Sequence, residues 1–343
     1  MSTESILRIE NLRFSFMTYA GEIQAVRGIS LEVKAGEVLG LVGESGCGKS
    51  VACKSILRLN PEDNGVYLPG SRILFEGKDV LTMSERELLR LRANDIRMVF
   101  QDPMTSLNPT MKVGKQIAEG ILNAFPKMKR REAKELAIET LRDTGIPNAE
   151  KRYEQYPHQF SGGMRQRAMI ALALAVKPKL LICDEPTTAL DVTLQAQILD
   201  MLRSLQAKYQ TAIIFITHDL GVVANIADHI AVMYAGKIME YGNGQDIFYD
   251  PKHPYTWGVL QSVPPIDADT SVPLVPISGS PPDLFKPPIG CPFTARCPHA
   301  MEVCRQHYPS PQQASERHIV TCWLYHAYAP HVINPITNEE AVL

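Results

Sequence analysis

The residues with the clearest chemistry form one glycine-rich stretch, Gly43-Glu44-Ser45-Gly46-Cys47-Gly48-Lys49-Ser50. An apolar run at 38–42 leads into it, and a helical pattern at 50–57 follows. Glycines let successive backbone N–H groups turn around a phosphate without Cβ clashes, and the N-terminus of a helix adds positive charge there. Lys49 would then reach the β- and γ-phosphates, and the Ser50 hydroxyl would bind Mg²⁺. We therefore predict a nucleotide site, which includes the next residue, Val51, and suits a kinase or a GTPase equally. A turn that binds nothing is the alternative.

Two carboxylates follow an apolar run at 180–183 and are candidates for metal binding and water activation. Open α/β sheets bind their ligands at the carboxyl ends of the strands. Asp184 would hold Mg²⁺ there through its water shell, and Glu185 would orient or deprotonate the attacking water. The solvated start of a loop is the alternative, but the glycine-rich loop elsewhere in the chain favours the catalytic interpretation.

Two further polar side chains also end apolar runs that we expect to be strands. His218 would reach the edge of the γ-phosphate, although a lone histidine is more often a structural hydrogen-bond donor. Gln101 would contact the metal or the attacking water, and it would move with the segment that follows it.

A second anion-binding helix end is predicted at Ser161-Gly162-Gly163, which opens the helix that carries the apolar run 168–176. The N–H groups and the dipole of such a helix end face outward. Two phosphate-binding helix ends of one chain are hard to bring onto a single nucleotide. We therefore expect the second one to serve a nucleotide held by another subunit, with an ordinary helix cap as the alternative.

Strand and helix patterns between these residues predict how they are positioned. Residues 6–42 are expected to form short strands. The region from Asp102 to about Gln159 has helical patterns and is expected to be an inserted helical part. Apolar runs at 180–183 and 212–216, with a helix at 193–209 between them, favour a parallel sheet covered on both faces. The fold class is therefore α/β.

The composition limits the classes of protein and partner that fit this chain. It has 343 residues, 45% of them hydrophobic, which is enough for two or three compact parts. The formal net charge of −2 gives no basic field for nucleic acid. Residues 1–5 lack the pattern of a leader, and the longest apolar run, 168–176, is far shorter than the about 20 residues of a spanning helix. We expect a cytosolic protein whose membrane role, if it has one, is peripheral.

The composition changes near residue 250. Of the 25 prolines, 16 fall in the last 93 residues, which favours turns and extended segments over long elements. Four of the seven cysteines lie in this tail, at Cys291, Cys297, Cys304 and Cys322. Four thiolates suit either a structural Zn²⁺ or a [4Fe–4S] cluster, and free thiols are the third possibility. The spacing lacks the short C-x2-C pairs that are usual for zinc.

Taken in order along the chain, these residues resemble the ATPase subunit of an ATP-binding-cassette (ABC) transporter. The resemblance covers residues 6 to about 245 and rests on the loop at 43–50, Gln101, Ser161-Gly162-Gly163-Met164-Arg165-Gln166, Asp184-Glu185, Leu190-Asp191 and His218. It implies a P-loop NTPase cassette with an antiparallel β subdomain, an inserted α-helical subdomain and a Pro/Cys-rich C-terminal extension. The cassette would occupy 1–250 and the extension 251–343.

The same resemblance implies roles for single residues. Phe16, which the sequence alone leaves as either an adenine-stacking or a core aromatic, becomes the aromatic of the adenine platform. Gln101 becomes the Q-loop, Asp191 the dimer-contact loop and His218 the switch histidine. Two cassettes of this family dimerise head to tail, so that each ATP lies between one subunit's glycine-rich loop and the other's signature motif. The commonest signature is Leu-Ser-Gly-Gly-Gln, and this chain departs from it at Phe160 and Met164.

A closer resemblance is to the D-type ATPase subunit of oligopeptide and dipeptide importers, and it extends through the tail. It rests on the segments 100–109, 156–160 and 250–256. It implies ATP, Mg²⁺ and, by preference over zinc, a [4Fe–4S] cluster on the tail cysteines. It also implies a related F-type ATPase as heterodimer partner, two membrane permeases and an extracytoplasmic peptide-binding protein, at the cytoplasmic face of the bacterial inner membrane. Import of nickel or another small solute is the alternative, followed by a soluble ABC ATPase of DNA repair or translation.

Overall fold

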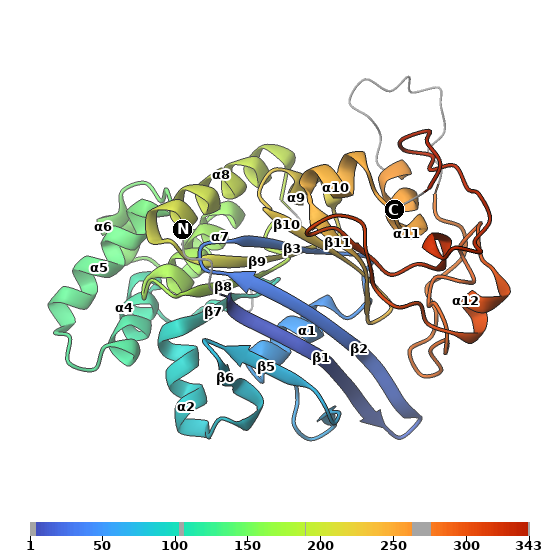
Figure 1. The fold of residues 1–343 in the computed structure, drawn as a ribbon. Coiled ribbons are helices and arrows are strands. Elements are labelled where there is room, and N and C mark those ends of the chain that lie inside the picture. The colour runs from blue at the N-terminus through green and yellow to red at the C-terminus, as the bar shows by residue number, and fades with distance from the viewer. Residues whose placement is uncertain (1–4, 103–105, 189, 263–275, 342–343) are drawn as a thin grey trace. The chain divides into compact units, whose positions relative to one another are not determined.

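The computed structural model describes residues 5–102, 106–188, 190–262 and 276–341 (Figure 1). The chain divides into two compact units, each built from separate stretches of sequence. Unit 1 comprises Met1–Arg8, Glu32–Val38 and Leu74–Ile216, and unit 2 comprises Ile9–Leu31, Leu39–Ile73 and Thr217–Leu343. The long strands β1 (Ser5–Thr18) and β2 (Gly21–Lys34) run from one unit into the other.

Unit 1 contains three parallel strands in the order β7 (Ile96–Val99), β8 (Leu180–Asp184) and β9 (Ala212–Thr217). Every residue of β8 and β9 is buried, as expected for a parallel sheet covered on both faces. Helices α7 (Gly162–Leu174) and α8 (Val192–Tyr209) belong to the same unit. The predicted strands at 180–183 and 212–216 and the helix at 193–209 are confirmed.

The helical part of unit 1 contains α4 (Val113–Ala124), α5 (Arg130–Asp143) and α6 (Ala149–Tyr153), which lie together in Figure 1. Helix α4 packs closely on α6, because a Cβ added at Gly114 would lie 2.0 Å from the Tyr153 ring. Helix α5 ends before Gly145, whose φ of 72° turns the chain away. Three residues of the predicted segment 100–109, Pro103, Met104 and Thr105, lie outside the described residues.

The remaining elements of unit 1 are short. Strand β5 (Arg72–Phe75), which begins in unit 2, pairs antiparallel with β6 (Lys78–Asp79). The other elements are η1 (Val80–Thr82), α2 (Glu85–Arg90), η2 (Leu91–Asp95) and η3 (Pro157–Gln159).

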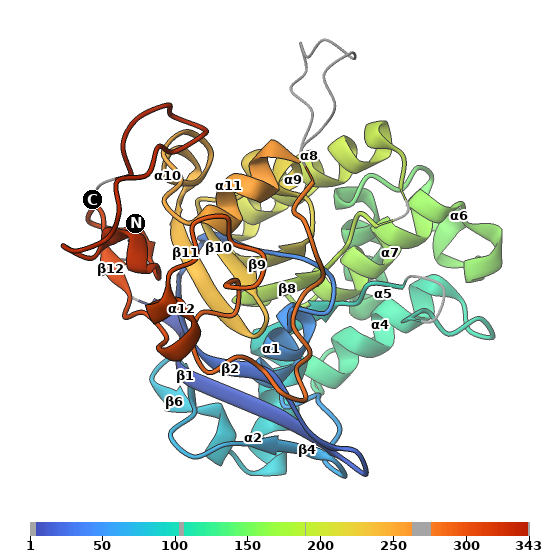
Figure 2. The same cartoon turned by 90° about the vertical axis from the view of Figure 1, so that its right-hand side faces the viewer.

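In unit 2, β3 (Val38–Val42) pairs in parallel with β10 (His229–Tyr234). The first residue of β3 belongs to unit 1. Strand β10 turns at Ala235-Gly236 into the antiparallel β11 (Lys237–Asn243), and the two strands form a hairpin (Figure 2). Strand β4 (Gly65–Tyr67) pairs antiparallel with β1. Its helices are α1 (Lys49–Ile56), α9 (Leu220–Ala224), α10 (Gly244–Tyr249), α11 (Pro254–Gln261) and α12 (Glu302–Gln306).

The tail from residue 251 belongs to unit 2, and in its described part β13 lies against β11. Strand β13 (Ile319–Val320) pairs with β11 and with β12 (Gln312–Gln313), and η4 (Trp323–Tyr325) follows. The tail core contains the buried side chains of Trp257, Val320, Cys322 and Leu324. Of the helices in the described ranges, none has the length and apolar character that crossing a bilayer requires.

One buried carboxylate joins the tail to the sheet. Glu240 of β11 is fully buried and accepts the backbone N–H groups of Lys252 at 2.5 Å and His253 at 2.9 Å. It also shares a hydrogen bond of 2.7 Å with Nε2 of His318, which precedes β13. Three separate stretches of the chain therefore meet at one side chain.

Candidate functional site

The glycine-rich loop joins β3 to α1 in the way that the sequence predicts. Gly43, Gly46 and Gly48 have φ values of 154°, 78° and 102°, in the region that favours glycine. A Cβ at Gly43 would lie 2.0 Å from the carbonyl oxygen of Met233, and one at Gly48 would lie 2.3 Å from that of Ala25. The first and last of these glycines are therefore required by both backbone angle and space. Ser45 and Gly46 are exposed at the tip of the loop.

Lys49 lies within the loop, with only 5% of its surface exposed. Its Nζ donates hydrogen bonds to the carbonyl oxygens of Gly43 at 2.7 Å and Glu44 at 3.0 Å. Burial raises the pKa of the Cys47 thiol, and the nearby Lys49 charge offsets part of this effect. The loop thus presents one buried cation and a neutral thiol, and the hydroxyl of Ser50 follows on α1.

The predicted catalytic carboxylate has an unusual backbone. Glu185 has a φ of 48°, and its N–H donates to the carbonyl oxygen of Ile216 at 3.0 Å. Its Oε2 accepts hydrogen bonds from Nε2 of Gln101 at 3.1 Å and from the hydroxyl of Thr188 at 2.9 Å. The left-handed backbone costs on the order of 1–3 kcal/mol, and such strain is common at functional sites.

The structure therefore brings Gln101 and Glu185 together. The sequence assigned Glu185 to the attacking water and Gln101 to that water or to the metal. Asp184, at the end of β8, is 3% exposed. Thr188 was not predicted. Its signal was a hydroxyl residue three positions after the carboxylate, a spacing that lets a side chain reach back across a turn.

The second helix end has the predicted cap. Ser161 precedes α7, and its hydroxyl accepts the N–H of Met164 at 3.3 Å. Ser161 and Gly162 are exposed, and a Cβ at Gly162 would meet no atom within 4 Å. Gly163 is buried against the Leu194 side chain of α8, and a Cβ there would lie only 2.6 Å from it. Asp191 caps the same α8 by accepting the N–H of Leu194 at 2.9 Å.

The other predicted nucleotide residues lie in unit 2 with the glycine-rich loop. Phe16 is half-buried on β1, and its ring meets that of Phe14 edge to face with centroids 5.1 Å apart. His218 is exposed and follows β9 directly. Gln101, Ser161, Asp184, Glu185 and Asp191 lie in unit 1.

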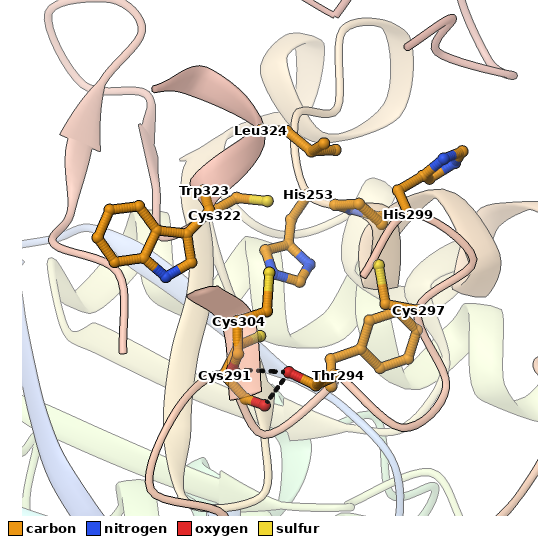
Figure 3. A pocket seen from close by; sticks show the side chains of 11 residues that line it. His253, Cys291, Thr294, Cys297, His299, Cys304, Cys322, Trp323 and Leu324 are labelled. Carbon is orange, nitrogen blue, oxygen red and sulfur yellow. Dashed lines mark hydrogen bonds between the residues drawn. The ribbon is translucent and has the colours of Figure 1, made fainter. Parts of the chain in front are cut away.

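The prediction of an iron–sulfur cluster on Cys291, Cys297, Cys304 and Cys322 is wrong. The four thiols line a cavity of about 20 Å³ next to the ring of His253 (Figure 3), which leaves room for about one water molecule. Burial raises the pKa of Cys291 to about 11 and that of Cys297 to about 12, so these thiols stay protonated. Among the described residues, no cluster of cysteine, histidine or acidic side chains could hold a metal ion. The zinc alternative is not supported either, and all seven cysteines are free.

Contacts to the loop from the tail were also missed by the sequence reasoning. The Arg296 guanidinium pairs with the Glu44 carboxylate, and the Tyr255 hydroxyl accepts the Glu44 N–H. These residues are separated from Glu44 by 252 and 211 positions, and no local pattern indicates that they meet.

Comparison with known families gives two matches along the chain. A family model described as ABC transporter matches residues 26–188. A second model, described as the C-terminal region of oligopeptide/dipeptide transporters, matches residues 239–304. The two matches together include the glycine-rich loop, the predicted catalytic carboxylate and most of the cysteine-containing tail.

Curated relatives are similar over nearly the whole chain. The oligopeptide transport ATP-binding protein OppD of Bacillus subtilis is 54% identical over 330 residues, which cover 96% of this chain and 92% of that protein. The dipeptide transport ATP-binding protein DppD of the same organism is 52% identical, with 96% and 98% covered. OppD of Escherichia coli is 50% identical over 89% of each chain.

Solved structures share the fold of the cassette. The structure of cbiO1 from Clostridium perfringens, described as part of the ABC transporter complex cbiONQ, has a TM-score of 0.61 and 31% identity, with 72% of this chain and 92% of that chain covered. A dimeric post-hydrolysis state of the ATP-binding cassette MJ0796, bound to ADP and Pi, has a TM-score of 0.62 and 24% identity, with 69% and 98% covered.

Proposed function

This chain belongs to the ATP-binding subunits of ABC transporters, in the oligopeptide/dipeptide branch, and we propose that it hydrolyses ATP to power the import of oligopeptides or dipeptides. The observation that carries the proposal is the 54% identity to an oligopeptide transport ATP-binding protein over 96% of the chain. The family resemblance and the cassette fold expected from the sequence are confirmed. Nickel import and a soluble role in DNA repair or translation are not favoured. The division into a cassette at 1–250 and an extension at 251–343 is part of the proposal.

The glycine-rich loop is proposed as the phosphate site of ATP. The loop fits a phosphate group for two reasons. The space at Gly43 and Gly48 admits no side chain, and the buried Lys49 ammonium supplies a positive charge. The Ser50 hydroxyl and the Asp184 carboxylate have the oxygen chemistry that Mg²⁺ prefers. When bound, this metal neutralises phosphate charge. The half-buried ring of Phe16 would stack on the adenine.

Glu185 is proposed as the group that orients and deprotonates the attacking water. The hydrogen bonds from Gln101 and Thr188 hold its Oε2 in one orientation and support this role. His218 is proposed to contact the γ-phosphate, and Asp191 to contact a second cassette.

Each ATP site is proposed to be completed by a second subunit. The exposed helix end at Ser161 and Gly162, with open space at the Cβ position of Gly162, supports this role. We propose an F-type paralogue as that subunit, beneath two membrane permeases that receive peptide from an extracytoplasmic binding protein. The location would be the cytoplasmic face of the bacterial inner membrane, and recovery of the permeases with this chain in detergent tests it.

The variant Glu185→Gln tests the catalytic proposal in the purified transporter. Removal of the negative charge takes away the proton acceptor, so we expect ATP hydrolysis to fall by at least about 100-fold. ATP binding should be kept and the closed dimer should accumulate. The matched control is Glu119→Gln, on an exposed position of α4. Hydrolysis by Glu185→Gln at the wild-type rate would show that another group activates the water.

A further inference from the structure

Arg296 of the tail forms an ion pair with the phosphate loop through one guanidinium nitrogen. Its Nη1 lies 3.0 Å from Oε1 and 2.8 Å from Oε2 of Glu44, the second residue of the glycine-rich loop. The Arg296 side chain is 6% exposed and that of Glu44 is 29% exposed. The Arg296 charge is therefore held away from solvent, while the Glu44 carboxylate keeps part of its contact with water.

The other two nitrogens of the guanidinium also donate hydrogen bonds. Nε donates to the carbonyl oxygen of Ser278 at 2.9 Å, and Nη2 donates to that of Ile277 at 3.2 Å. Nη1 also lies 3.1 Å from the hydroxyl of Tyr234 at the end of β10. A planar guanidinium with all three nitrogens engaged is held in one orientation. Arg296 is therefore a fixed charge beside the loop.

A second tail residue holds the backbone of the same loop position. The hydroxyl of Tyr255, a fully buried residue of α11, accepts the N–H of Glu44 at 3.1 Å. Burial raises the pKa of Tyr255, so the hydroxyl stays neutral. The rings of Tyr234, Tyr255 and Phe293 pack with centroids 4.6–5.4 Å apart and leave the hydroxyl little freedom.

Glu44 also contacts Lys49, the lysine proposed to bind phosphate. The carbonyl oxygen of Glu44 is one of the two that accept hydrogen bonds from Lys49 Nζ. The carboxylate of Glu44 is a negative charge on the loop that has to receive a polyanion. Without a partner, this charge would oppose the binding of phosphate groups.

We propose that Arg296 is a positioning residue of the ATP site: it neutralises the Glu44 carboxylate and fixes the loop residue that anchors Lys49. The tail thereby becomes part of the nucleotide site of its own chain. This inference rests on the proposed function, since it takes the loop at 43–50 to be the ATP site.

Equilibrium titration of the purified transporter with a fluorescent ATP analogue measures the effect. We expect Arg296→Met to raise the Kd for the nucleotide about tenfold, which is the usual size of a coupling between two sites. Adding Glu44→Gln to Arg296→Met removes the unpaired charge and should return the Kd to within about twofold of wild type. The control is Arg305→Met, because Arg305 is 71% exposed and lies 4.0 Å from Glu302.

Two further measurements separate neutralisation of charge from loss of structure. The ratio of the Kd of Arg296→Met to that of wild type should shrink in 1 M salt. The Debye length is then about 3 Å, so the repulsion between the Glu44 carboxylate and the phosphates is screened. Arg296→Lys keeps the charge but loses the planar guanidinium that also bonds to Ser278 and Ile277. Its Kd should fall between those of wild type and Arg296→Met, even if the methionine variant disturbs the tail.

An unchanged Kd in Arg296→Met overturns the proposal, and so does a raised Kd that neither Glu44→Gln nor salt corrects. A wild-type protein that fails to bind the analogue instead overturns the proposed function itself.

Discussion

Replacing the buried Glu240 by alanine should unfold the tail at a much lower urea concentration than in the wild-type protein. The carboxylate accepts two backbone N–H groups and pairs with the ring of His318. Removing one partner of such a buried charged group leaves its donors unsatisfied and costs about 3–5 kcal/mol. With a urea m-value of about 2 kcal/mol/M, the midpoint should fall by about 2 M.

Tryptophan fluorescence measures this unfolding directly, because the chain has two tryptophans and both lie in the tail. Trp257 is 2% exposed, and its indole N–H donates to the carbonyl oxygen of Pro251. The control is Asp250→Asn, since the Asp250 side chain is 54% exposed and its carboxylate forms a solvated ion pair with the Lys252 ammonium. That variant should shift the midpoint by less than about 0.5 M. An Asp250→Asn shift as large as that of Glu240→Ala would refute the reasoning.

Two other changes follow from the loop and from the start of α11. Gly43→Ala should abolish nucleotide binding, because its Cβ would lie 2.0 Å from the Met233 carbonyl oxygen. The Cβ of Gly46→Ala meets no atom within 4 Å, so this variant should cost only about 1 kcal/mol of backbone strain in the loop. Titration with a fluorescent ATP analogue compares the two variants. Burial lowers the pKa of His253 from 6.5 to about 3. Between these pH values the unfolded chain binds a proton that the native tail does not. The free energy of unfolding should therefore fall as the pH drops, by at most about 1.4 kcal/mol per pH unit. His253→Asn keeps a helix cap without this titration, and its urea midpoint should depend less on pH; an unchanged slope would contradict the assignment.

The glycine-rich loop, the apolar strands and the capped helices could be predicted because their signals are local. Three glycines at fixed spacing, an apolar run before them and a helical pattern after them determine one conformation within a few residues. The pairing of Gln101 with Glu185 was accessible for a related reason. Both follow parallel strands, and the carboxyl ends of such strands share one edge of the sheet.

Other features depend on contacts that the sequence does not encode locally. Residues 6–42 were expected to form short strands, whereas β1 and β2 have 14 residues each. Strand β2 continues through Gly28 with a φ of 91°, where a Cβ would lie 2.9 Å from the Asn11 side chain. The pairing of Arg296 with Glu44 joins positions 252 apart. The cysteine spacing could not reveal that burial raises the pKa of Cys291 and Cys297 and keeps these two thiols protonated.

Unit 2 is built from early and late stretches of the sequence, so it can be completed only late in synthesis. Residues 39–73, which include the glycine-rich loop, share this compact unit with 217–343. A ribosome adds about 5–20 residues per second, so the loop waits on the order of tens of seconds for the last of its neighbours. Arg296 is made 252 residues after Glu44. A nascent chain therefore carries a complete glycine-rich sequence long before it carries the surroundings that hold that sequence in shape.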